Sequence, residues 1–265
     1  MARHDDEDDD DSPAHCGTGR TRLYVDQSLT PGTLIELNKD QSHYLVNVMR
    51  LDEGAYVQLF NNREGEFLAH IEERSKKACS LFVEQHLRAH TPLPDIWLLF
   101  APVKKARLDF IAQKATELGA ARIQPVITQR TIVSRVKDER LAANVIEAAE
   151  QCGMVALPEV GQTARLTDVL DQWSETAGER MILFCDEAAP AGGAKARLET
   201  LVAQGMKGKP LAILIGPEGG FSPEERARLL ARKDTCAISL GPRIMRADTA
   251  AIAALAVIGL MLGDW

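Results

Sequence analysis

The sequence predicts an α/β protein, in which a C-terminal α/β domain with a mainly parallel sheet follows a small N-terminal β-barrel. Three observations predict this fold class. After residue 95, apolar strand-like runs and helix-like segments alternate about six times, the pattern of α/β domains with a parallel sheet. Before residue 90, short segments of alternating hydrophobicity dominate, as in small barrels. The stretch TPLP at 91–94 puts two prolines between the two parts and marks their boundary.

The N-terminal part, residues 21–90, is expected to contain five strands and one short helix. Its strands alternate apolar and polar residues, and the sequence NNREGE supplies a turn between the third and the fourth. The expected strands are Arg22–Val25, Thr33–Leu37, Tyr56–Phe60, Glu66–Glu72 and Cys79–Glu84, and the expected helix is Asp40–Met49. Residues 1–20 hold seven acidic residues and contribute −5 to a formal net charge of −7. A block of like charge this dense is expected to be a disordered tail.

The C-terminal part, residues 91–265, is expected to alternate strands with helices. Its first helix has apolar residues at helical spacing, and Gly119 ends it. The expected strands are Ile96–Pro102, Ile123–Ile127, Met181–Cys185, Leu211–Ile215 and Cys236–Leu240, and the expected helices include Lys105–Leu118 and Asp138–Gln151.

Two glycine-bearing loops are the main functional signal. The strand Leu211–Ile215 is followed by GPEGGF and the strand Cys236–Leu240 by GPRIMRADT, and each loop leads into a helix. Loops at the carboxyl ends of neighbouring parallel strands form the crevice in which open α/β sheets bind ligands. Gly216, Gly219 and Gly220 lack Cβ atoms, so the backbone there can approach a ligand closely. We therefore predict a ligand site between the two loops.

The first loop indicates what kind of ligand binds. It lacks the lysine of a phosphate-binding P-loop and does not match GxGxxG. Ser222, Pro223 and Glu225 form a predicted capping box, so the following helix has its first N–H groups occupied by its own side chains. The expected ligand therefore carries little negative charge and is recognised by backbone groups.

The distribution of histidine restricts the chemistry. All six histidines precede residue 91, so the α/β domain has no imidazole base and no histidine-ligated metal, and we predict no metal site. Basic residues instead follow the ends of several strands. Because the carboxyl ends of parallel strands share one edge, these cations can form a phosphate-binding track, although any single one can also be a solvated surface charge. They are Lys104, Lys105, Arg107, Arg130, Arg135, Arg243 and Arg246.

The sequences LIGPEGGFSPEE and LGPRIMRADTA closely resemble the cofactor loops of the RsmE family of SPOUT methyltransferases. That family methylates N3 of a uridine in 16S ribosomal RNA of the small ribosomal subunit and uses S-adenosyl-L-methionine. Three further segments match in the same order, so the resemblance runs from about residue 22 to the C-terminus. They are HYLVNVMR (43–50), PVKKARLDFIAQKATELG (102–119) and EAAEQCG (147–153).

The resemblance implies a trefoil-knotted SPOUT domain, a PUA-like RNA-binding barrel and specific site residues. Two positions depart from the family: Met154 stands where an arginine is common, and Asp248 replaces the usual glutamate. The implied catalytic residues are Arg246 and Asp248. The implied cofactor-binding residues are Ile215, Gly216, Pro217, Glu218, Gly219, Gly220, Leu240, Gly241, Ile244, Met245, Arg246, Thr249 and Ala250. The implied RNA-binding residues are Arg22, His43, Arg50, Lys104, Lys105, Arg107, Arg130 and Arg243. For Arg22, His43 and Arg50, a structural ion pair or a satisfied imidazole is the alternative.

The remaining features indicate location and assembly. The five cysteines are scattered without a CxxC pair and no charged-then-apolar leader is present, which favours a cytoplasmic protein. The run Thr249–Gly263 is apolar on every side but shorter than the roughly 20 residues of a membrane span, so we predict no membrane association. A helix of this kind is normally buried, and SPOUT relatives dimerise through this region, so we expect a homodimer. Three alternatives remain: a SPOUT enzyme with another RNA target, a non-catalytic RNA-binding assembly protein and a Rossmann-type nucleotide enzyme.

Overall fold

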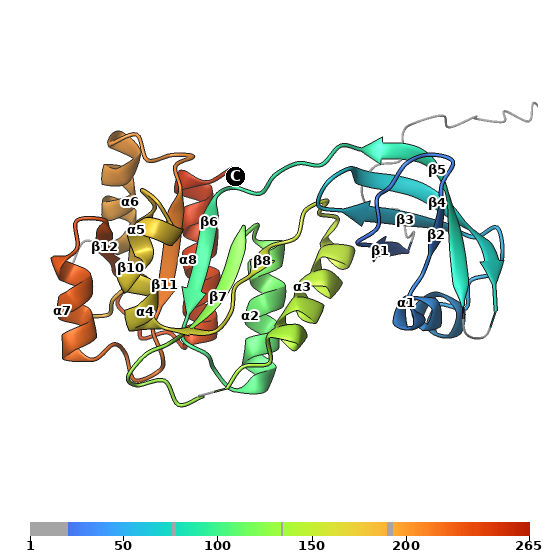
Figure 1. The fold of residues 1–265 in the computed structure, drawn as a ribbon. Helices are drawn as coiled ribbons and strands as arrows, with labels where there is room; N and C mark the ends of the chain where they lie inside the picture. Colours follow the sequence, from blue (N-terminus) through green and yellow to red (C-terminus); the bar gives the residue numbers. More distant parts are fainter. Residues whose placement is uncertain (1–20, 76–77, 134, 190–192) are drawn as a thin grey trace, which may run out of the picture.

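The computed structural model describes residues 21–75, 78–133, 135–189 and 193–265. Two bodies are joined by the segment that runs from the end of β5 at Arg88 to the start of β6 at Ile96 (Figure 1). The β-rich body comes first in the chain, and the larger α/β body follows. The acidic tail, expected to be disordered, lies outside the described residues.

The N-terminal body is a five-stranded sheet in the order β1-β3-β4-β5-β2. Pairing between β3, β4, β5 and β2 is antiparallel, whereas β1 runs parallel to β3. Its inner face carries the apolar core, which includes Val57, Leu59 and Leu81. The bounds are β1 Arg22–Tyr24, β2 Leu34–Glu36, α1 Lys39–His43, a π-helical turn η1 Tyr44–Val48, β3 Tyr56–Asn61, β4 Gly65–Arg74 and β5 Cys79–Arg88. All five strands expected in this part are confirmed.

The C-terminal body is a seven-stranded sheet whose main path has the order β12-β10-β11-β6-β7-β8, with β9 paired to β7. Every strand pair in it is parallel. The strands are β6 Ile96–Phe100, β7 Arg122–Ile127, β8 Glu159–Val160, β9 Ala164–Arg165, β10 Met181–Cys185, β11 Leu211–Ile215 and β12 Thr235–Ile238. The helices are α2 Lys105–Glu117, α3 Asp138–Cys152, α4 Leu166–Asp171, α5 Trp173–Thr176, α6 Gly193–Ala203, α7 Pro223–Ala231 and α8 Ala247–Leu262.

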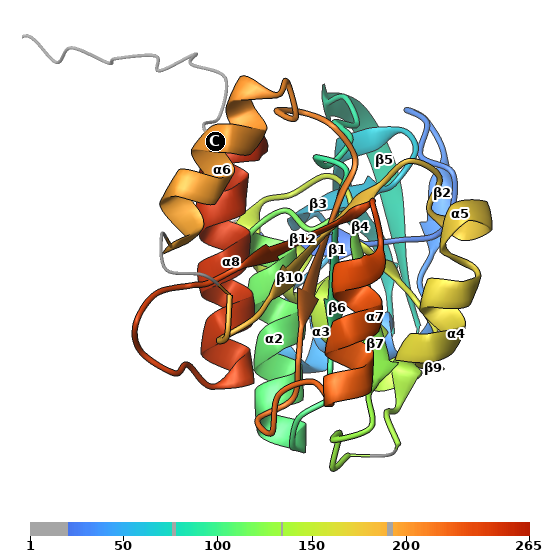
Figure 2. The same ribbon diagram turned by 90° about the vertical axis from the view of Figure 1, so that its left-hand side faces the viewer.

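Alternate residues of each central strand face two different helix layers, because successive side chains of a strand point to opposite faces. On one face, Leu98 and Ile213 pack with α2, α3, α6 and α8. On the other face, Leu99 and Leu214 pack with α4, α5 and α7. Figure 2 shows α2, α6 and α8 on one side of the sheet and α4, α5 and α7 on the other. This burial on both faces explains why the strands read as continuous apolar runs.

The structure corrects one prediction about the sheet. The strands that precede the two glycine loops are not neighbours, because β10 lies between β11 and β12. Other element bounds also differ from expectation, including that of β6, which ends at Phe100 instead of Pro102. β12 ends at Ile238 instead of Leu240, since its partner β10 ends at Cys185, the residue paired with Ile238. The helix expected at Asp40–Met49 is divided into α1 and η1.

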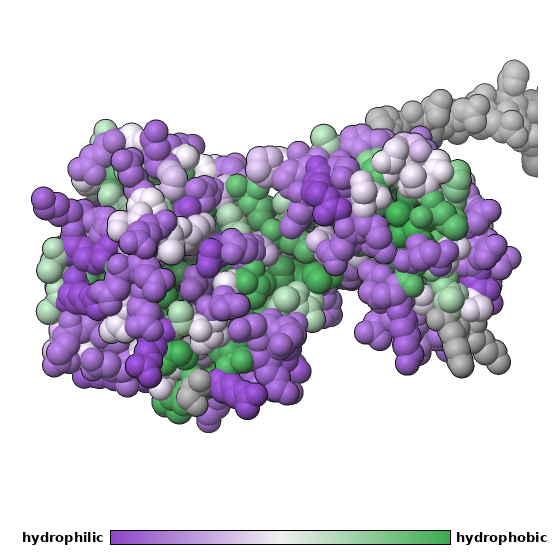
Figure 3. Space-filling view, in the orientation of Figure 1, coloured by the Kyte–Doolittle hydropathy of each residue, from purple (hydrophilic) through white to green (hydrophobic). Residues whose placement is uncertain are grey.

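The surface seen in Figure 3 is mostly hydrophilic, with hydrophobic patches between the two bodies and on the N-terminal one. Within the described ranges, no helix combines the length and the hydropathy needed to cross a bilayer.

Candidate functional site

A pocket of about 200 Å³ lies at the carboxyl ends of β10, β11 and β12. Three loops, one from each of these strands, form most of its lining, and the start of α8, Arg130 from the loop after β7 and Arg226 of α7 complete it. The lining residues are Arg130, residues 185–188, residues 215–221, Arg226, residues 239–241, residues 243–245, Ala247 and Ala250. This is the edge of a parallel sheet where ligands of open α/β folds bind.

The first glycine loop has a backbone that side chains would obstruct. Gly220 adopts a left-handed conformation with φ of +67°, and its N–H donates to the carbonyl of Pro217 at 2.8 Å, which closes a tight turn. A Cβ atom at Gly216 would lie 3.0 Å from the ring of Phe221. The positive φ therefore favours glycine at position 220, and a side chain at position 216 would be in tight contact with Phe221.

The helix that follows this loop is capped as predicted. Ser222 Oγ accepts the N–H of Glu225 at 3.1 Å, and Glu225 Oε2 accepts the N–H of Ser222 at 3.0 Å. Glu225 Oε1 also accepts the N–H of Gln129 at 2.8 Å, which ties the loop after β7 to the start of α7. The first N–H groups of α7 are therefore directed to protein groups, and the predicted capping box is confirmed.

Two arginines connect neighbouring loops to GPEGGF. Arg107, near the start of α2, donates from Nη1 to Glu218 Oε1 at 2.9 Å, and its Nε lies 3.7 Å from Asp248 Oδ2. Arg130, in the loop after β7, donates from Nη1 to the carbonyl of Gly219 at 2.8 Å. The two glycine loops and two basic segments are thus held together at one rim.

The loop after β10 contributes residues that the sequence predictions missed. Cys185 lines the pocket and packs against the core, where burial raises the pKa of its thiol to about 12. Asp186 is buried and accepts a hydrogen bond from Arg226 Nε at 2.8 Å. The sequence signal for this loop was the apolar run Met181–Cys185 followed by two acidic residues. Because β10 ends at the same sheet edge as the other two strands, these acidic residues lie at the pocket.

The structure brings most of the predicted cofactor residues together. All of them line the pocket except Arg246 and Thr249, which lie at the start of α8. Ile244 in the second loop is 85% exposed, so this side of the pocket opens to solvent. The cofactor contacts themselves stay predictions, as do the catalytic roles of Arg246 and Asp248.

The predicted RNA-binding residues other than Arg22 lie in three places. Arg107, Arg130 and Arg243 lie at the pocket or its rim, and Lys104 and Lys105 are exposed where β6 meets α2. His43 and Arg50 are exposed on the N-terminal body, where His43 Nδ1 lies 3.1 Å from the amide nitrogen of Asn47.

Arg22 is placed differently from the other predicted RNA contacts. Its side chain is 10% exposed and forms an ion pair with Glu66 at 2.7 Å, so the structural alternative is observed for this residue. A second ion pair, between Lys114 and Glu117 at 2.7 Å, lies on α2. Among the described residues, no cluster of three or more histidine, cysteine or acidic side chains could hold a metal ion.

Comparisons with known proteins agree with this geometry. Residues 90–259 match the family described as the RNA methyltransferase domain, and residues 37–84 match the RNA methyltransferase PUA domain. The chain is 32% identical over 241 residues to ribosomal RNA small subunit methyltransferase E of Rickettsia conorii, covering 91% of this chain and 95% of that protein. Against the Synechocystis protein of the same name the identity is 32%, over 91% of this chain and 78% of the relative.

Two solved structures are similar over 91% of the chain and 97% of their own length. A putative methyltransferase from Legionella pneumophila, in complex with bound S-adenosylmethionine, has 33% identity and a TM-score of 0.80. Ribosomal RNA small subunit methyltransferase E from Neisseria gonorrhoeae, bound to S-adenosylmethionine, has 27% identity and a TM-score of 0.76. The α/β body, its PUA-type N-terminal partner and a match over nearly the whole chain show that this protein belongs to the RsmE family of ribosomal RNA small subunit methyltransferases.

Proposed function

We propose that this protein transfers a methyl group from S-adenosyl-L-methionine to N3 of a uridine in 16S rRNA of the small ribosomal subunit. The observation that carries the proposal is the pocket in which the GPEGGF and GPRIMRADT loops meet at one sheet edge. Two family members that are similar to this chain over nearly their whole length hold S-adenosylmethionine in their structures. Small-subunit rRNA is the substrate named for the curated relatives.

The residues present suit this cofactor. Glycine backbone lines one wall, Leu240, Ile244 and Met245 supply apolar surface, and carboxylates of Glu187 and Glu218 lie at the pocket. The capped helix α7 leaves no free anion site at its N-terminus, in agreement with a ligand that carries little negative charge. S-adenosylmethionine supplies an activated methyl group on a sulfonium centre, so the protein has mainly to align the acceptor nitrogen with it and to exclude water.

The acceptor nitrogen carries a proton that must leave when the N3–methyl bond forms. Asp248 is our candidate to accept this proton, because its carboxylate lies at the start of α8 beside the second glycine loop. Arg107 lies between Asp248 and Glu218 and keeps both carboxylates at the rim. We assign Arg246, the residue that precedes α8, to a supporting electrostatic role at the same rim.

The rim cations Lys104, Lys105, Arg130 and Arg243 are proposed to contact rRNA phosphates. They are exposed and follow the carboxyl ends of three strands of one sheet. Each phosphate neutralised releases counterions, so binding of the subunit should weaken as salt rises, and removal of one contact should reduce that salt dependence by about one unit of slope.

A homodimer through α8 is proposed as the active assembly, in the cytoplasm where ribosomal subunits are found. One face of α8, including Ala254 and Ile258, is buried in the core of its own subunit. Val257 and Leu260 lie on another face and are exposed, at 37% and 59%. An exposed apolar helix face of this kind is typical of an interface.

The direct test is methyl transfer from tritium-labelled S-adenosylmethionine. Purified protein should label 16S rRNA in unmodified small subunits and leave large subunits unlabelled. Labelling of another RNA would indicate a different target for the same chemistry. Binding of S-adenosylhomocysteine without transfer to any RNA would point to a non-catalytic binding protein.

A further inference from the structure

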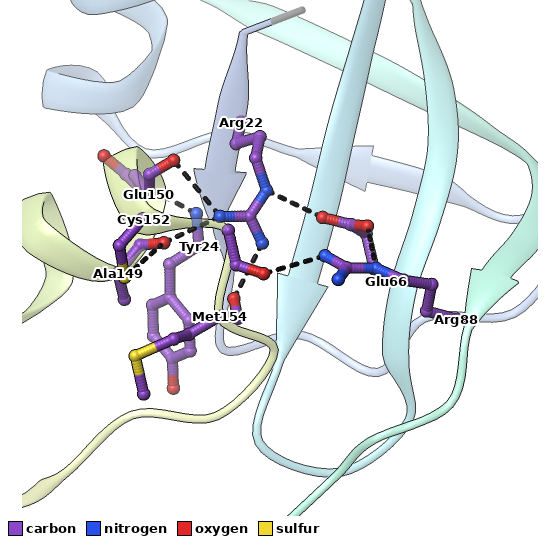
Figure 4. A network of polar contacts seen from close by, with 9 residues as sticks. Arg22, Tyr24, Glu66, Arg88, Ala149, Glu150, Cys152 and Met154 are labelled. Carbon is purple, nitrogen blue, oxygen red and sulfur yellow. Dashed lines mark hydrogen bonds and ion pairs between the residues drawn. The ribbon is translucent and has the colours of Figure 1, made fainter. Parts of the chain in front are cut away.

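The two domains meet where β1 of the N-terminal sheet lies against the end of α3 (Figure 4). Arg22 of β1 donates from Nη1 to the carbonyls of Ala149 at 2.7 Å and Glu150 at 3.1 Å. Its Nη2 donates to the carbonyl of Met154 at 2.7 Å. The last carbonyls of a helix have no partner within the helix, and a cation is favourable at that end. One side chain of the N-terminal domain therefore caps a helix of the other domain.

A buried carboxylate holds this arginine in place. Glu66, on β4, is 3% exposed. Its Oε1 accepts a hydrogen bond from Arg22 Nε at 2.7 Å, and its Oε2 accepts one from Arg88 Nε at 2.8 Å. Arg88 in turn donates from Nη2 to the carbonyl of Gly153 at 2.9 Å, just beyond α3. We call Arg22, Glu66 and Arg88 the arginine clamp.

Further contacts at the same junction involve neighbouring backbone. The N–H of Tyr24 donates to the Glu150 carboxylate at 3.0 Å, so the edge strand β1 is bound to the end of α3. The N–H of Leu157 donates to Asn62 Oδ1 at 2.6 Å. The guanidinium of Arg22 also lies 4.4 Å from the centre of the Phe60 ring. These fixed donors and acceptors disfavour rotation of the domains about the connecting segment.

Helix α3, whose last carbonyls the arginine clamp bonds, is connected through α2 to the rim of the pocket. Arg140, near the start of α3, bonds Asp109 of α2 at 2.8 Å. Arg107 of α2 bonds Glu218 in the first glycine loop. Helices α2 and α3 therefore support one side of the pocket rim. The arginine clamp contacts the end of α3 that is remote from this rim.

We propose that the arginine clamp is a positioning device, which fixes the orientation of the PUA-type domain so that rRNA held by both domains presents its target base at the cofactor pocket. The proposal rests on the proposed rRNA methylation. Methyl transfer depends on alignment, and a misplacement of about 1 Å can reduce a rate by about 100-fold. The clamp residues act through the domain orientation, and none of them needs to contact RNA.

Glu66→Gln tests this proposal most sharply. The substitution keeps the shape of the side chain and removes the charge that holds two arginines, and Glu66 is too buried to contact rRNA itself. We expect kcat/KM for small subunits to fall by about tenfold or more, while affinity for S-adenosylhomocysteine stays within about twofold. Small-angle scattering should show a broader distribution of interdomain distances than in the wild type.

Arg22→Lys is the second variant, because a lysine keeps the charge but cannot reproduce the forked contacts to three carbonyls and a carboxylate. Arg74→Ala is the matched control, since Arg74 bonds Leu51 and Asp52 within its own domain. Assays are run well below the unfolding temperature of each variant, so that a loss of stability does not appear as a loss of rate. The control should methylate like the wild type.

The outcomes distinguish the arginine clamp from a direct RNA contact by Arg22, and failure of the clamp from failure of the proposed function. If Arg22 contacted rRNA directly, Arg22→Lys would be mild and Glu66→Gln would leave kcat/KM unchanged, which would overturn the clamp. Unchanged scattering of Glu66→Gln would overturn it as well, whatever the activity. A wild-type protein that does not methylate small subunits would instead refute the proposed function, and the scattering would still decide whether the clamp fixes the domains.

Discussion

Replacement of Gly219 tests the location of the cofactor site with little risk to the fold. Gly219 lines the pocket, and its backbone lies outside the left-handed region, unlike Gly220 at φ of +67°. A Cβ atom at Gly219 would lie 3.6 Å from Arg130 Cβ, which is an ordinary contact. A valine is therefore compatible with the backbone, and we expect its methyl groups to narrow the pocket that Gly219 lines.

The size of the effect follows from these contacts. Inserting a branched side chain into an occupied site costs about 1–3 kcal/mol, which corresponds to roughly 5- to 150-fold weaker binding. The free energy of unfolding should change by less than about 1 kcal/mol, because loss of a glycine also reduces the entropy of the unfolded chain. Calorimetry with S-adenosylhomocysteine measures the binding affinity, and urea unfolding measures the free energy of unfolding.

Gly219→Ala is the matched control, since it adds a single methyl group in ordinary contact with Arg130. Its binding should lie between those of the wild type and the valine variant. Wild-type affinity in a folded Gly219→Val protein would refute the proposed location of the cofactor.

Three further predictions concern other parts of the chain. Deletion of residues 1–20 should leave methylation of small subunits near the wild-type rate, since the acidic tail precedes both family matches. Leu260→Asp should convert a dimer into a monomer of about 29.0 kDa by light scattering, because this exposed side chain lies on the proposed interface of α8; a dimer in the variant would place the interface elsewhere. Hydrogen bonds that the His70 ring donates to the carboxylates of Glu72 and then Glu84 raise the pKa of His70 above its ordinary value. The stability contributed by protonated His70 should therefore be complete below about pH 6.5 and be lost as pH rises through the raised pKa. An NMR titration of its ring should show the raised midpoint, and an ordinary value would contradict it.

Local sequence signals predicted local structure accurately. The start of α7 follows from Ser222, Pro223 and Glu225, whose capping interactions span three residues. β11 has the predicted bounds Leu211–Ile215, because an apolar run lies between a proline and a glycine. Both glycine loops could be recognised before the fold was known, and most of their predicted residues line one pocket.

Long-range pairing could not be predicted in the same way. Nothing within β11 or β12 indicates that β10 lies between them, so the loop at 185–188 was missed as a third wall of the pocket. Arg22 bonds a carbonyl that is 127 residues away in sequence. The resemblance implied an RNA contact for Arg22, with a structural ion pair as the alternative, and nothing in the local sequence indicated a helix end as its partner. The trefoil knot implied by the resemblance stays a prediction for the same reason, since local patterns do not specify threading.

The most direct test of the proposed function is the identity of the modified nucleoside. Unmodified small subunits are incubated with the protein and S-adenosylmethionine, and their 16S rRNA is digested and analysed by mass spectrometry. We predict one new nucleoside, N3-methyluridine, whose amount falls when Gly219→Val replaces the wild type at a limiting concentration of S-adenosylmethionine. A methyl group on a ribose, on another base or on no nucleoside of 16S rRNA would contradict the proposed reaction.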